Sequence, residues 1–259
     1  MPLCLTDRQR TALLALLEDG ARLRAEFPAV AGYLDTAPLL RGTESIEHDA
    51  AFDLSFAYIL TQYDGPNPYW TLIEDSVSAG EEGRVIDGGS LNGSPRLGFA
   101  ATILQDVYAH AVPSPSTIEW IGSVAQGRSI IDIGAGRGYW VAQLARAGLD
   151  VHAYDIEIPD KVWHVVQPVP EIPWIQAEEQ VLMLCWPPGW ADPMASTVLE
   201  RFTEAGGRRL IYIGEPQGGK TGDDAFFHAL KNGWKRQSVD SQYVRWWNLN
   251  DQAGYWERG

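Results

Sequence analysis

The glycine-rich segment from Asp132 to Gly138 and the carboxylate of Asp155 are the residues of this chain best suited to bind a nucleotide. Glycines occupy positions 134, 136 and 138, directly after an apolar run that starts at Ser129. Glycine accepts positive φ angles and has no Cβ to obstruct a ligand, and a helix that starts there offers unpaired N–H groups. Asp155 ends the next short apolar run, where a carboxylate can hold ribose hydroxyls. The spacing therefore predicts a nucleotide-like ligand over the turn.

Asp132 distinguishes two nucleotide-binding patterns. The dinucleotide pattern is G-x-G-x-x-G, whereas this chain has G-x-G-x-G with an aspartate two residues before the first glycine. A carboxylate inside an apolar strand is costly unless it finds a partner, and a cationic ligand group is one such partner. A nicotinamide or flavin site and an ordinary glycine-rich turn remain as alternatives.

Together with Asp155, this segment resembles the first two motifs of the class I S-adenosylmethionine (SAM)-dependent methyltransferases. In that family the glycine loop lies under the cofactor's methionine and ribose, the first acidic residue lies near its amino end, and the second binds the ribose hydroxyls. The resemblance implies SAM as the cofactor and an α/β fold with a doubly wound, mostly parallel, Rossmann-like sheet. The cofactor-binding residues that it implies are Asp132, Gly134, Ala135, Gly136, Gly138 and Asp155.

The segment Trp186 to Trp190 reads W-P-P-G-W and follows the expected fourth strand. Many amino-group methyltransferases carry Asn or Asp, two prolines and an aromatic residue at this place, and the amide or carboxylate accepts a hydrogen bond from the amine. An indole can only donate, so methylation of a nucleobase amine is not expected. Trp186 could face the sulfonium or the acceptor by a cation–π contact, or it could pack at the strand end.

Three further side chains are candidates for the reaction itself. Tyr108 and His110 lie where the helical part of the chain meets the expected sheet, and with the W-P-P segment they resemble a bacterial branch of the class I fold from about residue 105 onward. His110 could act as a general base, or it could cap a helix end, and Tyr108 could orient the acceptor or the cofactor. Glu215, directly after the fifth strand, could bind an amine substrate or be an exposed loop carboxylate.

Two regions must position these residues. Residues 1–112 carry helical periodicity, and we expect them to form a lid or substrate region. We expect a capping box at Thr6, breaks in the helical pattern at Pro28 and at the segment that ends in Pro68, and a long loop from 78 to 94. Residues 113–259 alternate strand and helix, which indicates a parallel sheet covered on both faces, and the resemblance implies that this is the SAM-binding domain. Its ligand should lie at the carboxyl ends of the strands. Ser114 and Thr221 are expected to cap helices here, and the tail from Trp234 to Trp256 has room for an antiparallel pair of strands.

Composition narrows the range of partners. The chain has 259 residues, a net charge of −14 and two cysteines, Cys4 and Cys185. The negative charge argues against nucleic acid and favours a small-molecule substrate, and two scattered cysteines indicate a reducing cytoplasm. We expect no metal, no signal peptide and no membrane-spanning segment, and a homodimer is compatible with the sequence.

These observations predict an enzyme, a SAM-dependent methyltransferase that aligns a small-molecule acceptor in line with the methyl group. One alternative keeps the cofactor but closes a ring within SAM and releases methylthioadenosine. The others are an NAD-dependent oxidoreductase and a non-catalytic SAM-binding protein.

Overall fold

A computed structural model describes residues 5–40, 45–80, 83–89, 94–169 and 174–259 of the chain, so Cys4 lies outside the described residues. The chain divides into two compact units. The first comprises Met1–Ala79, Val85–Val107 and Trp246–Asn248, and the second comprises Gly80–Arg84, Tyr108–Arg245 and Leu249–Gly259.

The first unit is helical. Its helices are α1 (Asp7–Glu18), α2 (Gly20–Glu26), α3 (Pro28–Thr36), α4 (Ile46–Thr61), α5 (Pro68–Ile73) and α6 (Pro95–Val107), with 3₁₀ turns η1 (Ala37–Leu39) and η2 (Glu74–Ser76). The capping box at Thr6 is confirmed, because its side chain accepts from Gln9 N while the Gln9 side chain accepts from Thr6 N. Inside the unit, Tyr33 stacks on Phe56 with ring centroids 3.9 Å apart.

The prolines of this unit begin helices that the sequence did not predict. Pro28 and Pro68 were expected to stop helical stretches, but each occupies the first position of a helix, α3 and α5 respectively. Proline is well tolerated there because its missing N–H would have no intrahelical partner, and its fixed φ angle suits the helix. A proline can therefore mark a new helix as well as an end.

The prediction of a long loop from residue 78 to 94 is wrong in part. It contains β1 (Val77–Gly80) and β2 (Gly83–Ile86), which join β9 (Val244–Trp246) in a three-stranded sheet of order β1-β2-β9. Residues 81–82 and 90–93 of the stretch lie outside the described part. Strand pairing with β9 comes from about 160 residues further along the chain, so no local pattern could have indicated it.

The second unit is built on a seven-stranded sheet of order β5-β4-β3-β6-β7-β10-β8. Its strands are β3 (Ile130–Ile133), β4 (Val151–Asp155), β5 (Val166–Pro168), β6 (Val181–Cys185), β7 (Arg209–Gly214), β8 (Trp234–Val239) and β10 (Gln252–Arg258). The pairs from β5 to β7 are parallel, and β10 runs antiparallel between β7 and β8. Without β10, this is the order of the doubly wound dinucleotide-binding sheet. The predicted α/β fold with a mostly parallel sheet is confirmed.

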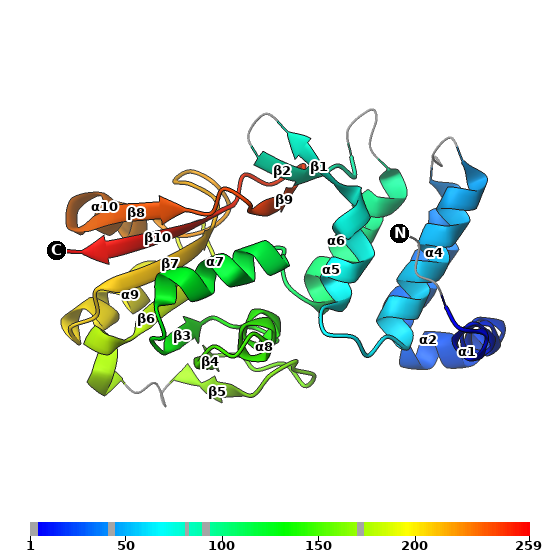
Figure 1. Cartoon of the computed structure of the whole chain (residues 1–259), viewed down its shortest axis with the longest axis horizontal. Coiled ribbons are helices and arrows are strands. Elements are labelled where there is room, and N and C mark those ends of the chain that lie inside the picture. Colours follow the sequence, from blue (N-terminus) through cyan, green and yellow to red (C-terminus); the bar gives the residue numbers. More distant parts are fainter. Residues whose placement is uncertain (1–4, 41–44, 81–82, 90–93, 170–173) are drawn as a thin grey trace. The chain divides into compact units, whose positions relative to one another are not determined.

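Helices cover both faces of this sheet (Figure 1). They are α7 (Pro115–Ala125), α8 (Tyr139–Arg146), α9 (Met194–Glu204) and α10 (Asp224–Gly233), with a 3₁₀ turn η4 (Trp174–Glu179). Successive strand residues alternate between the two faces: Ile130 packs in the core that contains α7 and α8, whereas Ile131 and Ile133 pack in the core of α9 and α10. By this alternation Asp132 faces the α7 and α8 side, where it must be accommodated in an apolar layer.

The sequence predicted the caps of two of these helices, and one of the two predictions is confirmed. Ser114 caps α7 by accepting from Thr117 N at 3.2 Å, as predicted. Thr221 was expected to cap α10, but Asp223 does so by accepting from Phe226 N at 3.1 Å. The hydroxyl of Thr221 instead accepts from Glu215 N, so it holds the turn after β7.

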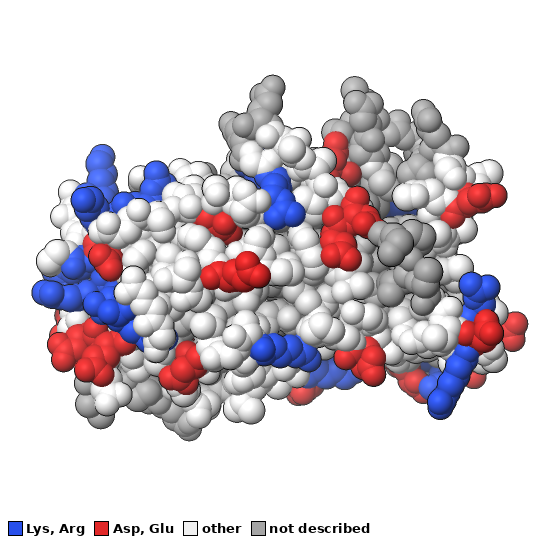
Figure 2. All heavy atoms as spheres, viewed as in Figure 1, with Lys and Arg blue, Asp and Glu red and all other residues white. Residues whose placement is uncertain are grey.

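The surface carries both signs of charge. Figure 2 shows basic side chains gathered over the end of the second unit that β8 and β10 form, where Lys235, Arg236 and Arg258 belong to these strands. Among the described residues, no helix has the length and apolar character that crossing a membrane requires.

Candidate functional site

The glycine loop joins β3 to α8 in left-handed backbone conformations. Gly134, Gly136 and Gly138 have φ angles of 79°, 54° and 70°, and Gly138 is the N-cap residue of α8. A Cβ at Gly136 would meet nothing within 4 Å, so the backbone there borders open space. The N–H groups of Gly134 and Ala135 donate to the carbonyl of Tyr154 at 2.8 and 3.1 Å, which ties the loop to the end of β4. The loop thus presents bare backbone at the carboxyl edge of the sheet.

Asp155 lies against this loop. Its Oδ2 accepts from Gly136 N at 2.7 Å, and its Oδ1 accepts from Glu157 N at 2.9 Å. The structure therefore brings the two sequence motifs together, although they are separated by about a helix and a strand. Each carboxylate oxygen keeps a further lone pair for a ligand hydroxyl, so the ribose-binding role expected of Asp155 fits this geometry and stays a prediction.

Asp132 is enclosed and incompletely bonded. It is 1% exposed, and its Oδ1 is buried without a hydrogen-bond partner among the described residues. Burial, and next the charge of Asp155, raise the pKa of Asp132 to about 8. A buried carboxylate in this state gains from a nearby cation, and the amino group of SAM carries one. The orphaned oxygen is thus the feature of the structure that fits the expected cofactor.

Trp186 and His110 form a pair beside the loop. The order of the sheet reverses between β3 and β6, and Trp186 follows β6 while the glycine loop follows β3. The rings of His110 and Trp186 stack with centroids 5.2 Å apart. His110 lies three residues beyond the last residue of α6, and both of its expected roles, general base and helix cap, stay predictions. Ligands of doubly wound sheets bind at such a reversal, so both rings are placed for contact with one.

Trp186 is held in an unusual backbone conformation. Its φ angle is 55°, its N–H donates to the carbonyl of Ile213 at 2.7 Å, and its Nε1 donates to Asp251 Oδ2 at 3.2 Å. A bulky residue at positive φ is strained, and such strain persists only where surrounding bonds hold it. These two hydrogen bonds fix the indole at the edge of β6.

Tyr108 belongs to an aromatic cluster. Its ring centroid lies 4.8 Å from that of Tyr139, the first residue of α8, and 5.1 Å from that of Trp163. Tyr108 is 4% exposed, and burial raises its pKa well above the usual range, so its hydroxyl stays protonated. It is therefore suited to donate a hydrogen bond and not to remove a proton. Its role in orienting a ligand stays a prediction.

Glu215 is buried, so the alternative that it is an exposed loop carboxylate is wrong. It is 4% exposed, its Oε2 accepts from Lys220 N at 2.6 Å, and its Oε1 accepts from Asn250 N at 3.0 Å. These bonds join the turn after β7 to the segment before β10. Both oxygens already serve backbone N–H groups, so the geometry favours a structural part, and amine binding by Glu215 stays a prediction.

Sequence reasoning missed the residues that surround this edge. Trp163 lies in an irregular segment, and Tyr243 and Asp251 lie in the tail that was read only as a terminal antiparallel pair. The hydroxyl of Tyr243 donates to Asp251 Oδ2, the same atom that accepts from Trp186. No motif spacing marks Asp251, because its partners lie 8 and 65 residues away.

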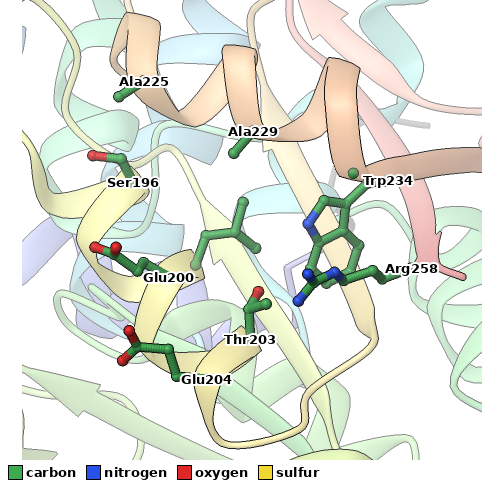
Figure 3. A pocket seen from close by; sticks show the side chains of 10 residues that line it. Ser196, Glu200, Thr203, Glu204, Ala225, Ala229, Trp234 and Arg258 are labelled. Atoms are coloured by element: carbon green, nitrogen blue, oxygen red, sulfur yellow. The ribbon is translucent and has the colours of Figure 1, made fainter.

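A separate hollow of about 450 Å³ opens between α9 and α10. Figure 3 shows Trp234 and Arg258 side by side, with Glu200, Thr203 and Glu204 of α9 across from them. Trp234 begins β8 and Arg258 ends the antiparallel β10, so both lie at the edge where β7 begins. This is the edge opposite the glycine loop, and ligands of doubly wound sheets are not expected there.

Comparisons with known proteins give only distant structural similarities. No protein-family model and no curated protein sequence matches the chain. The chain is similar to magnesium protoporphyrin IX methyltransferase from Synechocystis PCC 6803 with bound SAM, at 15% identity over 64% of this chain and 82% of that one, with a TM-score of 0.40. It is similar to 1,6-didemethyltoxoflavin-N1-methyltransferase from Burkholderia thailandensis, at 16% identity over 63% and 86% of the chains, with a TM-score of 0.42.

A third similarity is to a TehB-like SAM-dependent methyltransferase from Corynebacterium glutamicum, at 17% identity over 64% and 96% of the chains, with a TM-score of 0.39. At these identities the assignment of the fold rests on the strand order and the helix placement of the second unit itself. That order makes the second unit a doubly wound α/β domain with an antiparallel strand inserted beside its edge.

Proposed function

We propose that this protein is an enzyme that binds SAM in its second unit and transfers the methyl group to a small-molecule acceptor. The observation that carries the proposal is the buried Asp132, whose orphaned oxygen lies two residues before an open glycine loop that Asp155 holds. An uncompensated carboxylate at this place costs stability, and a cationic cofactor group would offset that cost.

We assign each residue of the site a role in binding the cofactor or the acceptor. Asp132 would bind the cofactor's ammonium group, Asp155 its ribose hydroxyls, and the backbone of Gly134, Ala135, Gly136 and Gly138 would lie beneath it. When bound, SAM supplies a methyl group that is already strongly electrophilic. The chain then has to hold the acceptor in line and exclude water, and the aromatic side chains of Tyr108 and Trp186 are suited to both tasks.

His110 would remove a proton where the acceptor must lose one, since its imidazole stacks on Trp186 at the same edge. The helices of residues 1–112 would act as a lid or substrate region. A cytoplasmic location, a homodimer and the absence of a nucleic-acid partner remain predictions of the sequence. Among the described residues, no three His, Cys, Asp or Glu side chains gather as metal ligands would.

Titration calorimetry tests the cofactor assignment. We expect S-adenosylhomocysteine to bind the wild-type protein and Asp155→Asn to weaken it about ten-fold or more, because charge-assisted hydrogen bonds to the ribose are lost. Asp160→Asn is the matched control, since Asp160 is an exposed carboxylate five residues further along the chain. Binding of NAD and not of S-adenosylhomocysteine would overturn the proposal in favour of an oxidoreductase.

Product analysis separates methyl transfer from its rival. Methyl transfer leaves S-adenosylhomocysteine, whereas ring closure within SAM leaves methylthioadenosine. Mass spectrometry after incubation with SAM and a mixture of small metabolites should show the first product. Methylthioadenosine alone would indicate a cyclase, and SAM binding without either product would indicate a sensor.

A further inference from the structure

Four carboxylates of the second unit lie at the carboxyl edge of its sheet. Asp132 lies on β3 and Asp155 ends β4, whereas Glu215 directly follows β7 and Asp251 directly precedes β10. Because β10 runs antiparallel to β7, its first residue pairs with the last residue of β7, and Asp251 is thereby on the same edge as the other three. Among the described residues, none of the four forms an ion pair with a lysine, arginine or histidine.

Two of these carboxylates act on the same thiol. Burial raises the pKa of Cys185, the last residue of β6, and the charges of Asp132 and Asp251 raise it further. Since the interaction between charges weakens with distance, both carboxylates lie near this thiol, beside the place where the order of the sheet reverses. A second carboxylate is therefore close to the one assigned to the cofactor's ammonium group.

Asp251 is held firmly but is incompletely bonded. Its Oδ2 accepts from Trp186 Nε1 at 3.2 Å and from the hydroxyl of Tyr243. Its Oδ1 is buried without a hydrogen-bond partner among the described residues, and the residue as a whole is 3% exposed. Glu215 differs, because both of its oxygens accept from backbone N–H groups. Asp251 thus has an oxygen whose burial costs free energy that a ligand N–H would offset.

The charge of Asp251 favours a cationic donor. Burial raises its pKa to about 6, the hydrogen bonds from Tyr243 and Trp186 lower it, and the charge of Glu215 raises it. The group is therefore mostly ionised at neutral pH, and a buried anion gains most from a charged N–H donor. SAM would not supply that donor, because its ammonium group is assigned to Asp132 and its sulfonium has no N–H.

We infer that the acceptor of the proposed methyl transfer is a basic amine, and that Asp251 binds its N–H group beside Trp186 and selects it over a neutral acceptor. The reaction rests on the proposed function, whereas the binding does not. His110 removes a proton from the ammonium form, and the nitrogen lone pair then forms a bond to the methyl carbon. The carbon–sulfur bond breaks with its electron pair on sulfur, which leaves S-adenosylhomocysteine. The positive charge on the product nitrogen stays opposite Asp251.

Three probes that share a benzyl group test this contact. Benzylammonium has a positive charge and N–H donors, benzyltrimethylammonium has the charge alone, and benzyl alcohol has a neutral donor. Ligand-observed NMR titrations of the full-length protein at neutral pH, with and without S-adenosylhomocysteine, give the dissociation constants. We expect benzylammonium to bind about ten-fold or more tightly than either other probe, because it alone can form a charge-assisted hydrogen bond. Any other order of affinities, or no binding of benzylammonium, would overturn the inference.

Asp251→Asn assigns the preference to its residue. The amide keeps an oxygen for Trp186 and Tyr243 and replaces the unpartnered oxygen by an N–H donor, so benzylammonium should bind this variant no better than benzyl alcohol binds the wild type. Asp160→Asn, at an exposed carboxylate, is the matched control and should keep the preference. An unchanged preference in folded Asp251→Asn would show that another group binds the amine.

A measurement on the wild type decides the matter if Asp251→Asn does not fold. The Trp186 Nε1–H donates to Asp251, so its indole NMR signal, identified with Trp186→Phe, should shift with benzylammonium and not with benzyl alcohol. The indole signal of Trp234, at the opposite edge of the sheet, should stay in place. A shift of Trp234 without Trp186, or no shift of Trp186, would contradict binding at Asp251.

The cofactor is followed in the same samples. Retained binding of S-adenosylhomocysteine with no preference for benzylammonium would defeat the inference and leave the proposed function. The preference for benzylammonium without any S-adenosylhomocysteine binding would defeat the proposed function and support the amine site.

Discussion

The two carboxylates at the glycine loop differ in what surrounds them. Asp155 accepts two backbone hydrogen bonds, whereas Asp132 has an orphaned oxygen inside the sheet. The first residue is satisfied without a ligand and shapes the loop. The orphaned oxygen of Asp132 destabilises the ligand-free protein, and a bound cation would offset that cost. Such a locally unfavourable arrangement is expected of a binding residue.

Asp132→Asn should therefore stabilise the ligand-free protein at alkaline pH and weaken cofactor binding. The folded-state pKa of Asp132, about 8, is above its value of 3.8 in a model compound, so the folded state holds a proton that the unfolded state has lost. Its contribution to stability falls as pH rises between these two values. In the variant this decline should be absent from urea denaturation curves measured across that range.

Calorimetry completes this test. A neutral amide cannot pair with an ammonium group, so S-adenosylhomocysteine should bind Asp132→Asn about ten-fold or more weakly at pH near 8. An unchanged dissociation constant in the folded variant would show that the cofactor's amino end lies elsewhere.

His110→Ala distinguishes proton removal from packing. If His110 is a general base, turnover should fall about 10²- to 10⁴-fold while S-adenosylhomocysteine affinity stays nearly constant, and the wild-type rate should decline below the histidine pKa. The matched control is His152→Ala, an exposed histidine on β4. If His110→Ala turned over at the wild-type rate, His110 would have only a packing role against Trp186.

At the scale of elements, β3, the glycine loop and α8 together form the candidate site at the carboxyl edge of the sheet. The turn requires three glycines at positive φ, and α8 begins only after the third. Gly134 is also closed to a side chain, because a Cβ there would lie 2.7 Å from Met194 Cε. Gly136 differs, since its surroundings are open. The positive φ angles explain why glycine is needed at both Gly134 and Gly136. Only Gly136 of these two borders open space that a ligand could occupy.

Gly136→Ala and Gly148→Ala form a matched pair. Both glycines have positive φ, 54° and 84°, and neither would place a Cβ within 4 Å of another group. Each variant should lose about 1–2 kcal/mol of folding stability from backbone strain. Calorimetry should show weaker S-adenosylhomocysteine binding for Gly136→Ala alone, because its methyl group occupies the ligand's space. Equal affinities would place the cofactor away from the loop.

At the scale of the whole molecule, three separate segments of the chain build the first unit. Residues Trp246–Asn248 belong to that unit although the chain on either side of them belongs to the second. Trp246 is fully buried, and its Nε1 donates to the hydroxyl of Tyr69 at 2.8 Å. A protein that began near residue 111 would lack Tyr69 and leave a large apolar side chain without its partners. Truncation is therefore a poor test of whether residues 1–112 act as a lid.

Tyr69→Phe is the sharper change in the full chain. It removes the acceptor of the Trp246 N–H, and a buried donor without a partner costs about 1–3 kcal/mol. Urea denaturation should show that loss, with S-adenosylhomocysteine affinity unchanged. Tyr63→Phe is the control, because the Tyr63 hydroxyl bonds Thr71 in a partly buried setting and its loss should cost less. A large fall in affinity for Tyr69→Phe would tie the first unit to the cofactor site.

The sequence by itself determined the alternation of strands and helices after residue 113, the glycine turn and the capping of α1 and α7. These features depend on residues close together in the chain, where local conformational preference and apolar periodicity decide the outcome. Tertiary structure alone decided the insertion of β10 between β7 and β8, the pairing of β9 with β2, and the burial of Glu215. It also decided that Asp251 meets Trp186 across 65 residues, because hydrogen bonds between distant segments follow from packing and leave no spacing in the sequence.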